Sequence, residues 1–227
     1  MCLYSKSCRL APSTHWRNAC GRRPYARGEA VCRKGDPGTN LYVITLGQVK
    51  LSLIAENGRE AILDLLGPGD VFGELALLDG EPRSADAIAT EASHVLLLDR
   101  DEFHRCVRQQ PEIAVHLLAV LSQRIRRDTR LMEEAAFLDV PRRLCGTLLR
   151  LARSGESRAA HATEAHELVT PRLVQSDLAA MAGTTRETLS KWLGVLEDEL
   201  LIRRMPQGRI LVLQPDELRR RYSVTRG

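Results

Sequence analysis

Hydrophobic and polar positions follow two different periods along the chain, which predicts a β-rich part followed by an α-helical part. Short apolar runs separated by turn residues predict the strands Leu41–Leu46, Val49–Ala55, Ala61–Leu66, Ser84–Thr90 and His94–Leu98. Asn57 and Gly58 are expected to turn the second strand into the third, because both residues tolerate a positive φ. Short strands joined by Gly- and Pro-containing turns are typical of a β-sandwich or roll.

The helical period begins near Asp101, which we expect to cap a short helix ending at about Gln109. Pro111 is expected to begin a longer helix that reaches about Leu138. On this helix, residues at alternating steps of three and four are apolar with one acidic exception: Leu118, Leu121, Ile125, Asp128, Met132 and Ala135. This spacing predicts the seam of a coiled-coil dimer, and the alternative is a helix that packs on its own β-domain.

Beyond the long helix, Asp139–Pro141 is predicted to join two domains, because a proline disfavours helix at the residue before it. A further helix is expected over Arg142–Arg153 and a polar loop over Ser154–Glu167. Residues 1–26 follow neither period, so an irregular arm is expected there.

Composition and charge narrow the class of protein. No apolar run approaches the ~20 residues of a membrane span and no signal-peptide pattern begins the chain, so we expect a cytoplasmic protein without a membrane partner. The 33 Lys and Arg exceed the 29 Asp and Glu mainly at the two ends of the chain. Basic ends indicate either a polyanionic partner or solvated arms.

The six cysteines form no CxxC pair and no zinc-ligand spacing, so we expect ordinary thiols and no metal site. An iron–sulfur or redox centre is the alternative, with the ligands Cys2, Cys8, Cys20 and either Cys32 or Cys106. No nucleophile–base pair or Walker-type loop occurs, which argues against an enzyme.

Residues 72–85 form a candidate anion site. A strand is expected to end at Gly73 and a one-turn helix to follow, which places backbone N–H groups near Arg83 and the Ser84 hydroxyl. Oriented amides and a guanidinium suit a phosphate, and glycine allows close approach to the backbone. Glu74 would repel a phosphate unless it accepted from hydroxyl groups such as those of a ribose, so the set indicates a nucleotide. A Gly/Pro turn with a surface Glu–Arg pair is the alternative.

Residues 173–193 have the spacing of a helix-turn-helix. Ser176 is expected to cap the first helix, Gly183 to break it and Thr185 to cap the second. The shared core would contain Leu178, Met181, Leu189, Trp192 and Leu193. A plain αα-hairpin is the alternative, but an expected β-hairpin around Met205–Gly208 would add a wing.

The second helix of this motif would expose Arg186, Glu187, Ser190 and Lys191. An arginine at this position suits guanine O6 and N7, and a glutamate can accept from cytosine N4. Ser176 and Thr185 would contact phosphates without reading the base sequence.

From about Tyr25 onward, the chain resembles the Crp/Fnr family of bacterial transcriptional regulators, which contains the cyclic AMP receptor protein. The resemblance rests on Gly73-Glu74-Leu75-Ala76 and Pro82-Arg83-Ser84-Ala85, which match the phosphate-binding cassette of cyclic-nucleotide-binding domains, and on Gly35–Gly38, Leu41–Val43 and Gly47 upstream. It implies that a cyclic nucleotide contacts Gly73, Glu74, Leu75, Ala76, Arg83 and Ser84, with Glu74 on the ribose 2′-hydroxyl and Arg83 and Ser84 on the phosphate. It also implies that Asp128 and Thr129 contact the purine.

For DNA, the resemblance implies contacts from Ser176, Thr184, Thr185, Arg186, Glu187, Ser190 and Lys191, where Lys191 stands in place of the family's usual arginine. The implied fold class is α+β. Its expected segments are an irregular basic arm (1–26), a cyclic-nucleotide-binding β-roll of jelly-roll type (27–110), a dimerisation helix (111–138), a winged helix-turn-helix DNA-binding domain (139–213) and a basic C-terminal tail (214–227).

We therefore expect a homodimeric regulator in which a nucleotide repositions two recognition helices on palindromic double-stranded DNA, with RNA polymerase as a further partner. Cyclic AMP is the first expected ligand because of the Pro-Arg-Ser-Ala form, and cyclic GMP is the second because guanine N1 and N2 match the carboxylate of Asp128. Asp128 also lies on the predicted seam, where two carboxylates would repel each other; the alternative is a surface pair with a nearby arginine. The alternative hypotheses for the function are a nucleotide-independent DNA binder and an FNR-type redox sensor.

Overall fold

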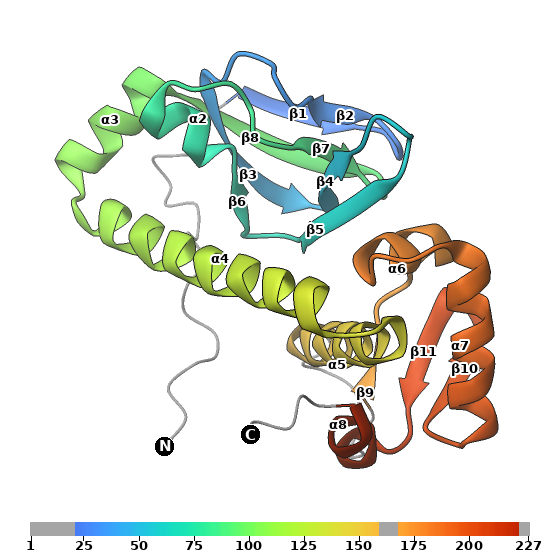
Figure 1. The fold of residues 1–227 in the computed structure, drawn as a ribbon. Coiled ribbons are helices and arrows are strands. Elements are labelled where there is room, and N and C mark those ends of the chain that lie inside the picture. The colour runs from blue at the N-terminus through green and yellow to red at the C-terminus, as the bar shows by residue number, and fades with distance from the viewer. Residues whose placement is uncertain (1–20, 159–167, 223–227) are drawn as a thin grey trace. The chain divides into compact units, whose positions relative to one another are not determined.

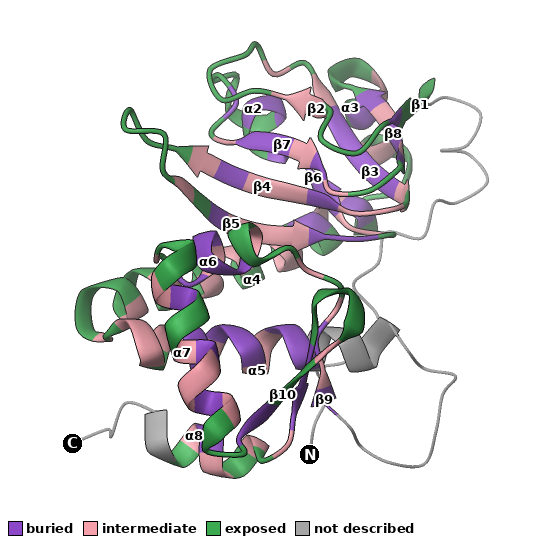
Figure 2. Ribbon diagram, turned by 90° about the vertical axis from the view of Figure 1, so that its right-hand side faces the viewer, coloured by how far each residue is buried: buried purple, intermediate pink, exposed green. Residues whose placement is uncertain are grey.

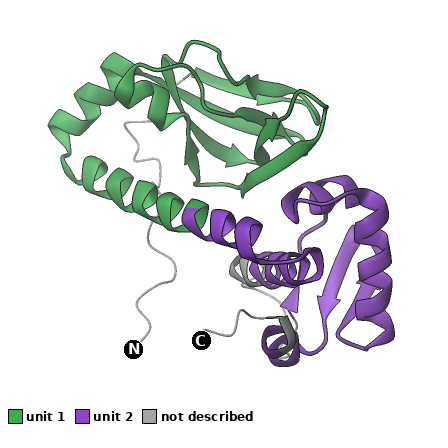
Figure 3. Cartoon of the chain, viewed as in Figure 1, with its two compact units in different colours: residues 1–128 green, residues 129–227 purple. Residues whose placement is uncertain are grey.

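The computed structural model describes residues 21–158 and 168–222, and the chain divides into two compact units, residues 1–128 and 129–227 (Figures 1 and 3). The division falls inside the longest helix, α4 (Glu112–Phe137), between Asp128 and Thr129. Residues 1–20, with three of the cysteines proposed as cluster ligands, lie outside the described part. Most of the expected polar loop, residues 159–167, also lies outside it.

The first unit contains two four-stranded antiparallel sheets. One sheet consists, in spatial order, of β1 (Gly21–Tyr25), β8 (Ser93–Asp99), β3 (Asn40–Leu46) and β6 (Val71–Phe72). The other consists of β2 (Ala30–Cys32), β7 (Asp86–Ala89), β4 (Val49–Ile54) and β5 (Glu60–Leu66). The β4–β5 hairpin turns at Gly58 with φ 76°, as the Asn-Gly pair predicts.

Both faces of β3 are buried, which explains its unbroken apolar run (Figure 2). Tyr42 and Ile44 point into a core shared by the two sheets, whereas Leu41 and Val43 point into a second core on the opposite face of their own sheet. Since successive side chains of a strand alternate between faces, a strand with two covered faces needs apolar residues at every position. The predicted β-roll is confirmed.

Three helices cover the second core of this unit: α2 (Glu74–Asp79), α3 (Arg100–Gln109) and the first half of α4, through Leu77, Phe103, Ile113 and Leu117. The cap of α3 differs from the expectation: Asp99, not Asp101, accepts from the backbone N–H of Glu102. The expected irregular arm over residues 1–26 is wrong for Gly21–Tyr25, which form β1 and pair with β8.

The second unit packs helices on a small antiparallel sheet of the spatial order β10 (Ile202–Met205), β11 (Arg209–Val212) and β9 (Leu168–Val169). Its helices after α4 are α5 (Val140–Arg158), α6 (Gln175–Met181), α7 (Arg186–Asp198) and α8 (Pro215–Tyr222). Leu144 and Leu148 of α5 and Leu189 and Leu193 of α7 are fully buried in the core. The turn η1 (Pro206–Gly208) joins β10 to β11, which confirms the expected hairpin.

Two further expectations for this unit are wrong. Helix α5 continues through Ser154–Arg158, where a loop was expected, and α8 occupies part of the segment expected to be a basic tail. The helical structure is interrupted near Asp139–Pro141, as expected: α4 ends at Phe137 and α5 begins at Val140. In the part of the chain that the structure describes, no helix is both long and apolar enough to cross a membrane.

Candidate functional site

The start of α2 and Arg83 form one tightly fitted structure. Gly73 caps α2 with φ 80°, and a Cβ at this position would lie 2.4 Å from Nη1 of Arg83 and 2.9 Å from the Tyr42 ring. The Arg83 guanidinium donates to the carbonyls of Gly73 and Asn40, each at 2.7 Å, and its Cζ lies 4.9 Å from the centroid of the Tyr42 ring. Only a glycine gives both this backbone conformation and this close approach.

Arg83 is 5% exposed, and its Nε is buried without a hydrogen-bond partner. Within the described residues its guanidinium has neutral carbonyls as partners and no carboxylate. A buried positive charge without an opposite charge is unfavourable unless a ligand compensates it. The side chain is therefore suited to an anion.

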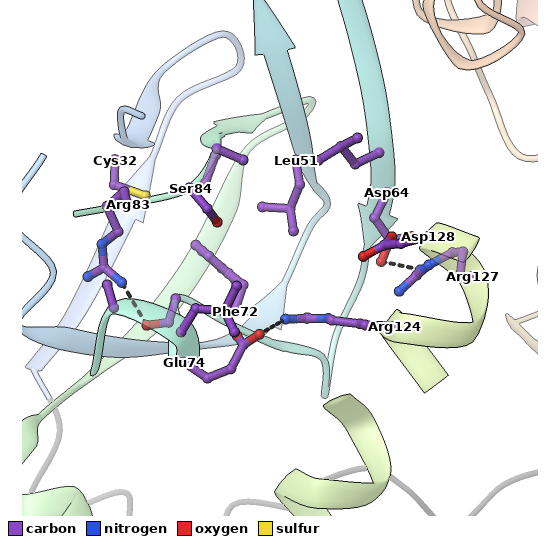
Figure 4. Close-up of a pocket in the computed structure, with 16 residues that line it drawn as sticks. Cys32, Leu51, Asp64, Phe72, Glu74, Arg83, Ser84, Arg124, Arg127 and Asp128 are labelled. Carbon is purple, nitrogen blue, oxygen red and sulfur yellow. Dashed lines mark hydrogen bonds and ion pairs between the residues drawn. The ribbon is translucent and has the colours of Figure 1, made fainter. Parts of the chain in front are cut away.

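A cavity opens beside Arg83 and contains about 690 Å³ of empty space, its open mouth included (Figure 4). The sequence-predicted residues Gly73, Glu74, Leu75, Ala76, Arg83, Ser84 and Asp128 all line it. Thr129 does not line it, so only one of the two predicted purine contacts lies at this cavity.

Glu74 is 2% exposed and forms an ion pair with Arg124 of α4, which also donates to the carbonyl of Val71. The second carboxylate oxygen, Oε2, is buried and makes no hydrogen bond. A carboxylate oxygen in this position is an acceptor without a donor. The surface Glu–Arg pair considered as the alternative is wrong, because both Glu74 and Arg83 are buried and each has a different partner.

Arg124 and a second ion pair at this cavity were missed by sequence reasoning. Asp64 of β5 pairs with Arg127 of α4, and burial raises the pKa of the Asp64 carboxyl, with the Arg127 and Arg124 charges opposing that shift. The signal available in the sequence was the spacing of Arg124, Arg127 and Asp128, which places all three on one side of a helix.

Asp128 is exposed, lines the cavity and, among the described residues, makes no hydrogen bond or ion pair. The alternative of a surface pair between Asp128 and an arginine is therefore wrong. The place of Asp128 on a dimer seam stays a prediction. The exposed apolar stripe of α4 runs through Val115, Leu118, Ile125 and Met132, which are 66%, 63%, 66% and 73% exposed.

The apolar stripe of α4, defined by these four residues, shares Leu118, Ile125 and Met132 with the predicted seam. Leu121, another predicted member of the seam, is half-buried and packs against the core of the first unit. Ser122 and Thr129 occupy the polar positions of the same stripe, four residues after Leu118 and Ile125 respectively, and both are exposed. An exposed apolar stripe of this kind is characteristic of a helix that pairs with another helix.

The helix-turn-helix forms as expected from α6, Gly183 with φ 61°, and α7. Thr185 caps α7 and accepts from the backbone N–H of Thr188 at 3.3 Å. Ser176 does not cap α6; Val174 occupies the cap position, and Ser176 is an exposed residue of the first turn. Thr184 is half-buried in the turn, where its backbone N–H donates to the carbonyl of Ala179.

Four predicted DNA-contacting residues, Arg186, Glu187, Ser190 and Lys191, line one exposed depression together with Gln175, which sequence reasoning missed. A hydrogen bond from its own backbone N–H, followed by one from the Thr185 hydroxyl, lowers the pKa of the Glu187 carboxyl. Its charged form accepts hydrogen bonds from bases such as cytosine. The arrangement offers two cations, one anion and one hydroxyl to a groove.

Arg143 fixes the turn of this motif, and sequence reasoning missed it too. Its guanidinium donates to the carbonyls of Ala182 at 3.0 Å, Gly183 at 3.1 Å and Leu138 at 2.7 Å. These carbonyls lie at the C-terminal ends of α6 and α4, where unsatisfied acceptors and the helix dipole favour a cation.

The cysteines in the described part of the chain form no cluster of metal ligands. Cys32, Cys106 and Cys145 are free thiols, and burial raises the pKa of Cys145 to about 12. Within residues 21–158 and 168–222, no three His, Cys, Asp or Glu side chains are grouped as metal ligands.

Comparison with known proteins gives two family matches. Residues 22–110 match the cyclic nucleotide-binding domain, and residues 142–221 match the Crp-like helix-turn-helix domain. The CRP-like cAMP-activated global transcriptional regulator of Mycobacterium tuberculosis is 36% identical over 167 residues, 74% of this chain and 73% of that protein. The cyclic AMP receptor protein of Thermus thermophilus is 35% identical over 185 residues, 82% of this chain and 81% of that protein.

Solved structures agree with these matches. A CRP/FNR-family transcriptional regulator from Thermus thermophilus superposes with a TM-score of 0.71 at 28% identity, covering 91% of this chain and all of the other. The c-di-GMP-responsive global regulator CLP of Xanthomonas campestris superposes with a TM-score of 0.73 at 24% identity, covering 86% of this chain and 94% of the other. This second likeness concerns the fold.

Proposed function

Since the chain belongs to the Crp/Fnr family of bacterial transcriptional regulators, we propose that it binds cyclic AMP in the cavity beside Arg83 and that this ligand controls its binding to DNA. At the level of the family, it is a DNA-binding transcriptional regulator with a cyclic-nucleotide-binding domain. The ligand, the contact residues and the control mechanism are the proposal.

Arg83 carries the nucleotide proposal. Its buried guanidinium has a free Nε and no carboxylate partner among the described residues, so a phosphate would compensate its charge. Ser84 lines the same cavity and offers a hydroxyl, and Gly73 allows the Arg83 guanidinium to lie close to the backbone. The unpaired Oε2 of Glu74 then accepts from the ribose hydroxyl, which places phosphate and sugar at this end of the cavity.

Cyclic AMP is proposed before cyclic GMP because two of the relatives carry cyclic AMP in their names. Asp128 supports a purine in general, since its unpaired carboxylate accepts from the amino group of adenine or from N1 and N2 of guanine. Thr129 is proposed to act from the exposed side of α4, next to the apolar stripe, and not from within this cavity.

Two copies of the chain are proposed to pair through residues 111–138, along the apolar stripe of α4. Each copy then presents Arg186, Glu187, Ser190 and Lys191 to one half of a palindromic site, with the two recognition helices about one DNA turn (~34 Å) apart. Ser176, Thr184 and Thr185 are proposed to contact phosphates. The ligand shifts the dimer towards this arrangement only if it binds the DNA-competent state more tightly.

A regulator of this kind works in the cytoplasm with RNA polymerase as a partner, and the proposal assigns no catalytic role to any residue. The domain limits are proposed as in the sequence analysis, with a roll at 27–110 and a DNA-binding domain at 139–213. The one change is that the roll also includes β1.

The first test is isothermal titration calorimetry of cyclic AMP and cyclic GMP. Arg83→Gln is expected to weaken both nucleotides at least about tenfold, because it removes the charge that holds the phosphate. Asp128→Ala is expected to weaken the preferred nucleotide, whereas Glu133→Ala, an exposed acidic residue of α4 that does not line the cavity, is the control. No heat with either nucleotide in the wild type would favour a nucleotide-independent DNA binder.

A further inference from the structure

The cavity has a second charged end, formed by Asp64, Arg127 and Asp128. Figure 4 shows these three side chains together on one side of the cavity, with Arg83 and Ser84 on the other side. Asp64 comes from β5, and Arg127 and Asp128 come from α4. If the phosphate lies at Arg83, the base of the nucleotide extends towards this end.

The Asp64–Arg127 ion pair leaves both partners with unused hydrogen-bonding capacity. Asp64 accepts from Arg127 through Oδ2 and from the backbone N–H of Leu65 through Oδ1 at 2.9 Å, although a carboxylate accepts about four hydrogen bonds. Arg127 lines the cavity with a side chain that is 32% exposed, and it pairs with Asp64 through Nη1, which leaves further N–H groups on the guanidinium. The pair therefore presents a carboxylate acceptor and an N–H donor next to each other.

We propose that Asp64 and Arg127 read the base edge of the bound nucleotide and select adenine; this inference rests on the proposed function. Adenine presents a donor, the N6 amino group, beside an acceptor, either N1 or N7, on both of its polar edges. The carboxylate of Asp64 accepts from N6 while the guanidinium of Arg127 donates to the neighbouring ring nitrogen. Leu51 and Leu63, which also line the cavity, supply apolar contact for the ring faces.

Guanine fits the same pair less well. One of its polar edges carries two acceptors, O6 and N7, and would place an acceptor against the Asp64 carboxylate. Only its other edge offers donors, so guanine is restricted to one orientation whereas adenine has two. Arg124 does not change this preference, because its guanidinium is already paired with Glu74 and the Val71 carbonyl.

The experiment compares cyclic AMP with the 3′,5′-cyclic monophosphate of purine riboside, which differs from it only in lacking the 6-amino group. Calorimetry gives the affinity ratio of the two ligands, and the ratio cancels any general weakening of the pocket. The wild type is expected to favour cyclic AMP by about tenfold or more, as for a hydrogen bond to a charged acceptor. Asp64→Ala is expected to lower this ratio about fivefold or more, and Asp128, whose carboxylate also accepts from the amino group, accounts for the preference that remains.

Two further variants keep the test decisive. Asp64→Asn preserves the shape of the side chain if Asp64→Ala proves unstable, and it is expected to reduce the ratio about fivefold because an amide oxygen is a weaker acceptor. Glu60→Ala is the matched control, because Glu60 lies on the same strand in an ion pair with Lys50 at 2.9 Å and does not line the cavity. Its ratio is expected to equal that of the wild type.

The outcomes separate the two proposals. A wild type that binds no cyclic nucleotide removes the proposed function and this inference with it. A wild type that binds cyclic AMP, with the same ratio in Asp64→Ala, overturns the inference and leaves the proposed function standing. A wild type that prefers cyclic GMP overturns the selection of adenine by this pair.

Discussion

Replacing Gly73 by alanine tests how closely the anion site is fitted. Gly73 has φ 80°, and an added Cβ would lie 2.4 Å from Nη1 of Arg83 and 2.9 Å from Cδ2 of Tyr42. The guanidinium is held by two hydrogen bonds of 2.7 Å, so it cannot move aside without weakening at least one of them. Gly73→Ala should therefore affect both folding and ligand binding.

Two contributions set the size of the effect. A left-handed backbone at a non-glycine residue costs about 1–2 kcal/mol. Losing one hydrogen bond from a charged donor adds about 1.5–3 kcal/mol, so a total near 3–4 kcal/mol is expected. Gly58→Ala is the matched control, because Gly58 has φ 76° but nothing lies within 4 Å of its added Cβ. The control should lose only about 1–2 kcal/mol.

Urea unfolding followed by circular dichroism measures the free energy of unfolding for both variants, and calorimetry measures their affinity for cyclic AMP. Gly73→Ala should be less stable than Gly58→Ala by about 2 kcal/mol and bind the nucleotide at least about tenfold more weakly. Equal stability and equal affinity in the two variants would refute the reasoning, because the expected difference comes from the contacts of the added Cβ with Arg83 and Tyr42.

Three other predictions concern the second unit and α4. Arg143→Ala removes three hydrogen bonds to backbone carbonyls, so it should lower the free energy of unfolding by about 2–3 kcal/mol and weaken DNA binding. The control is Arg142→Ala, a substitution of the exposed neighbouring residue, which should change the free energy of unfolding by no more than about 0.5 kcal/mol. Equal denaturation curves for the two variants would contradict this prediction. Arg186→Ala should cost about 1–3 kcal/mol of DNA binding and relax selectivity at one base pair, and uniform weakening across sequences would reassign it to a phosphate. Ile125→Glu should give a monomer in sedimentation velocity, and an unchanged dimer would exclude the apolar stripe as the interface.

Features carried by local sequence were predicted well. Thr185 caps its helix as predicted, and the short helix begins directly after Gly73 as predicted, because a side-chain acceptor and a positive φ are properties of single residues. The strands β3, β4 and β5 appear where the apolar runs are, and the Asn-Gly turn connects β4 to β5. In these cases the residue types alone determine the backbone conformation.

Features that depend on distant contacts could not be predicted. Strand β1 is exposed along most of its length, so it lacks an apolar period, and it exists because its backbone pairs with β8 about 70 residues later. The heptad spacing of α4 includes Leu121, and its partial burial against the roll depends on residues that are distant in the sequence. The ion pair between Arg124 and Glu74 joins residues 50 positions apart, so only the fold brings them together.

The central claim is that a cyclic nucleotide controls DNA binding, and fluorescence anisotropy with a labelled palindromic duplex tests it most directly. The wild type is titrated into the duplex without nucleotide, with cyclic AMP and with cyclic GMP at constant ionic strength, because salt alone changes such affinities. The account predicts that cyclic AMP tightens binding about tenfold or more and that Arg83→Gln abolishes the increase. The same DNA affinity with and without either nucleotide, at every concentration, would contradict it.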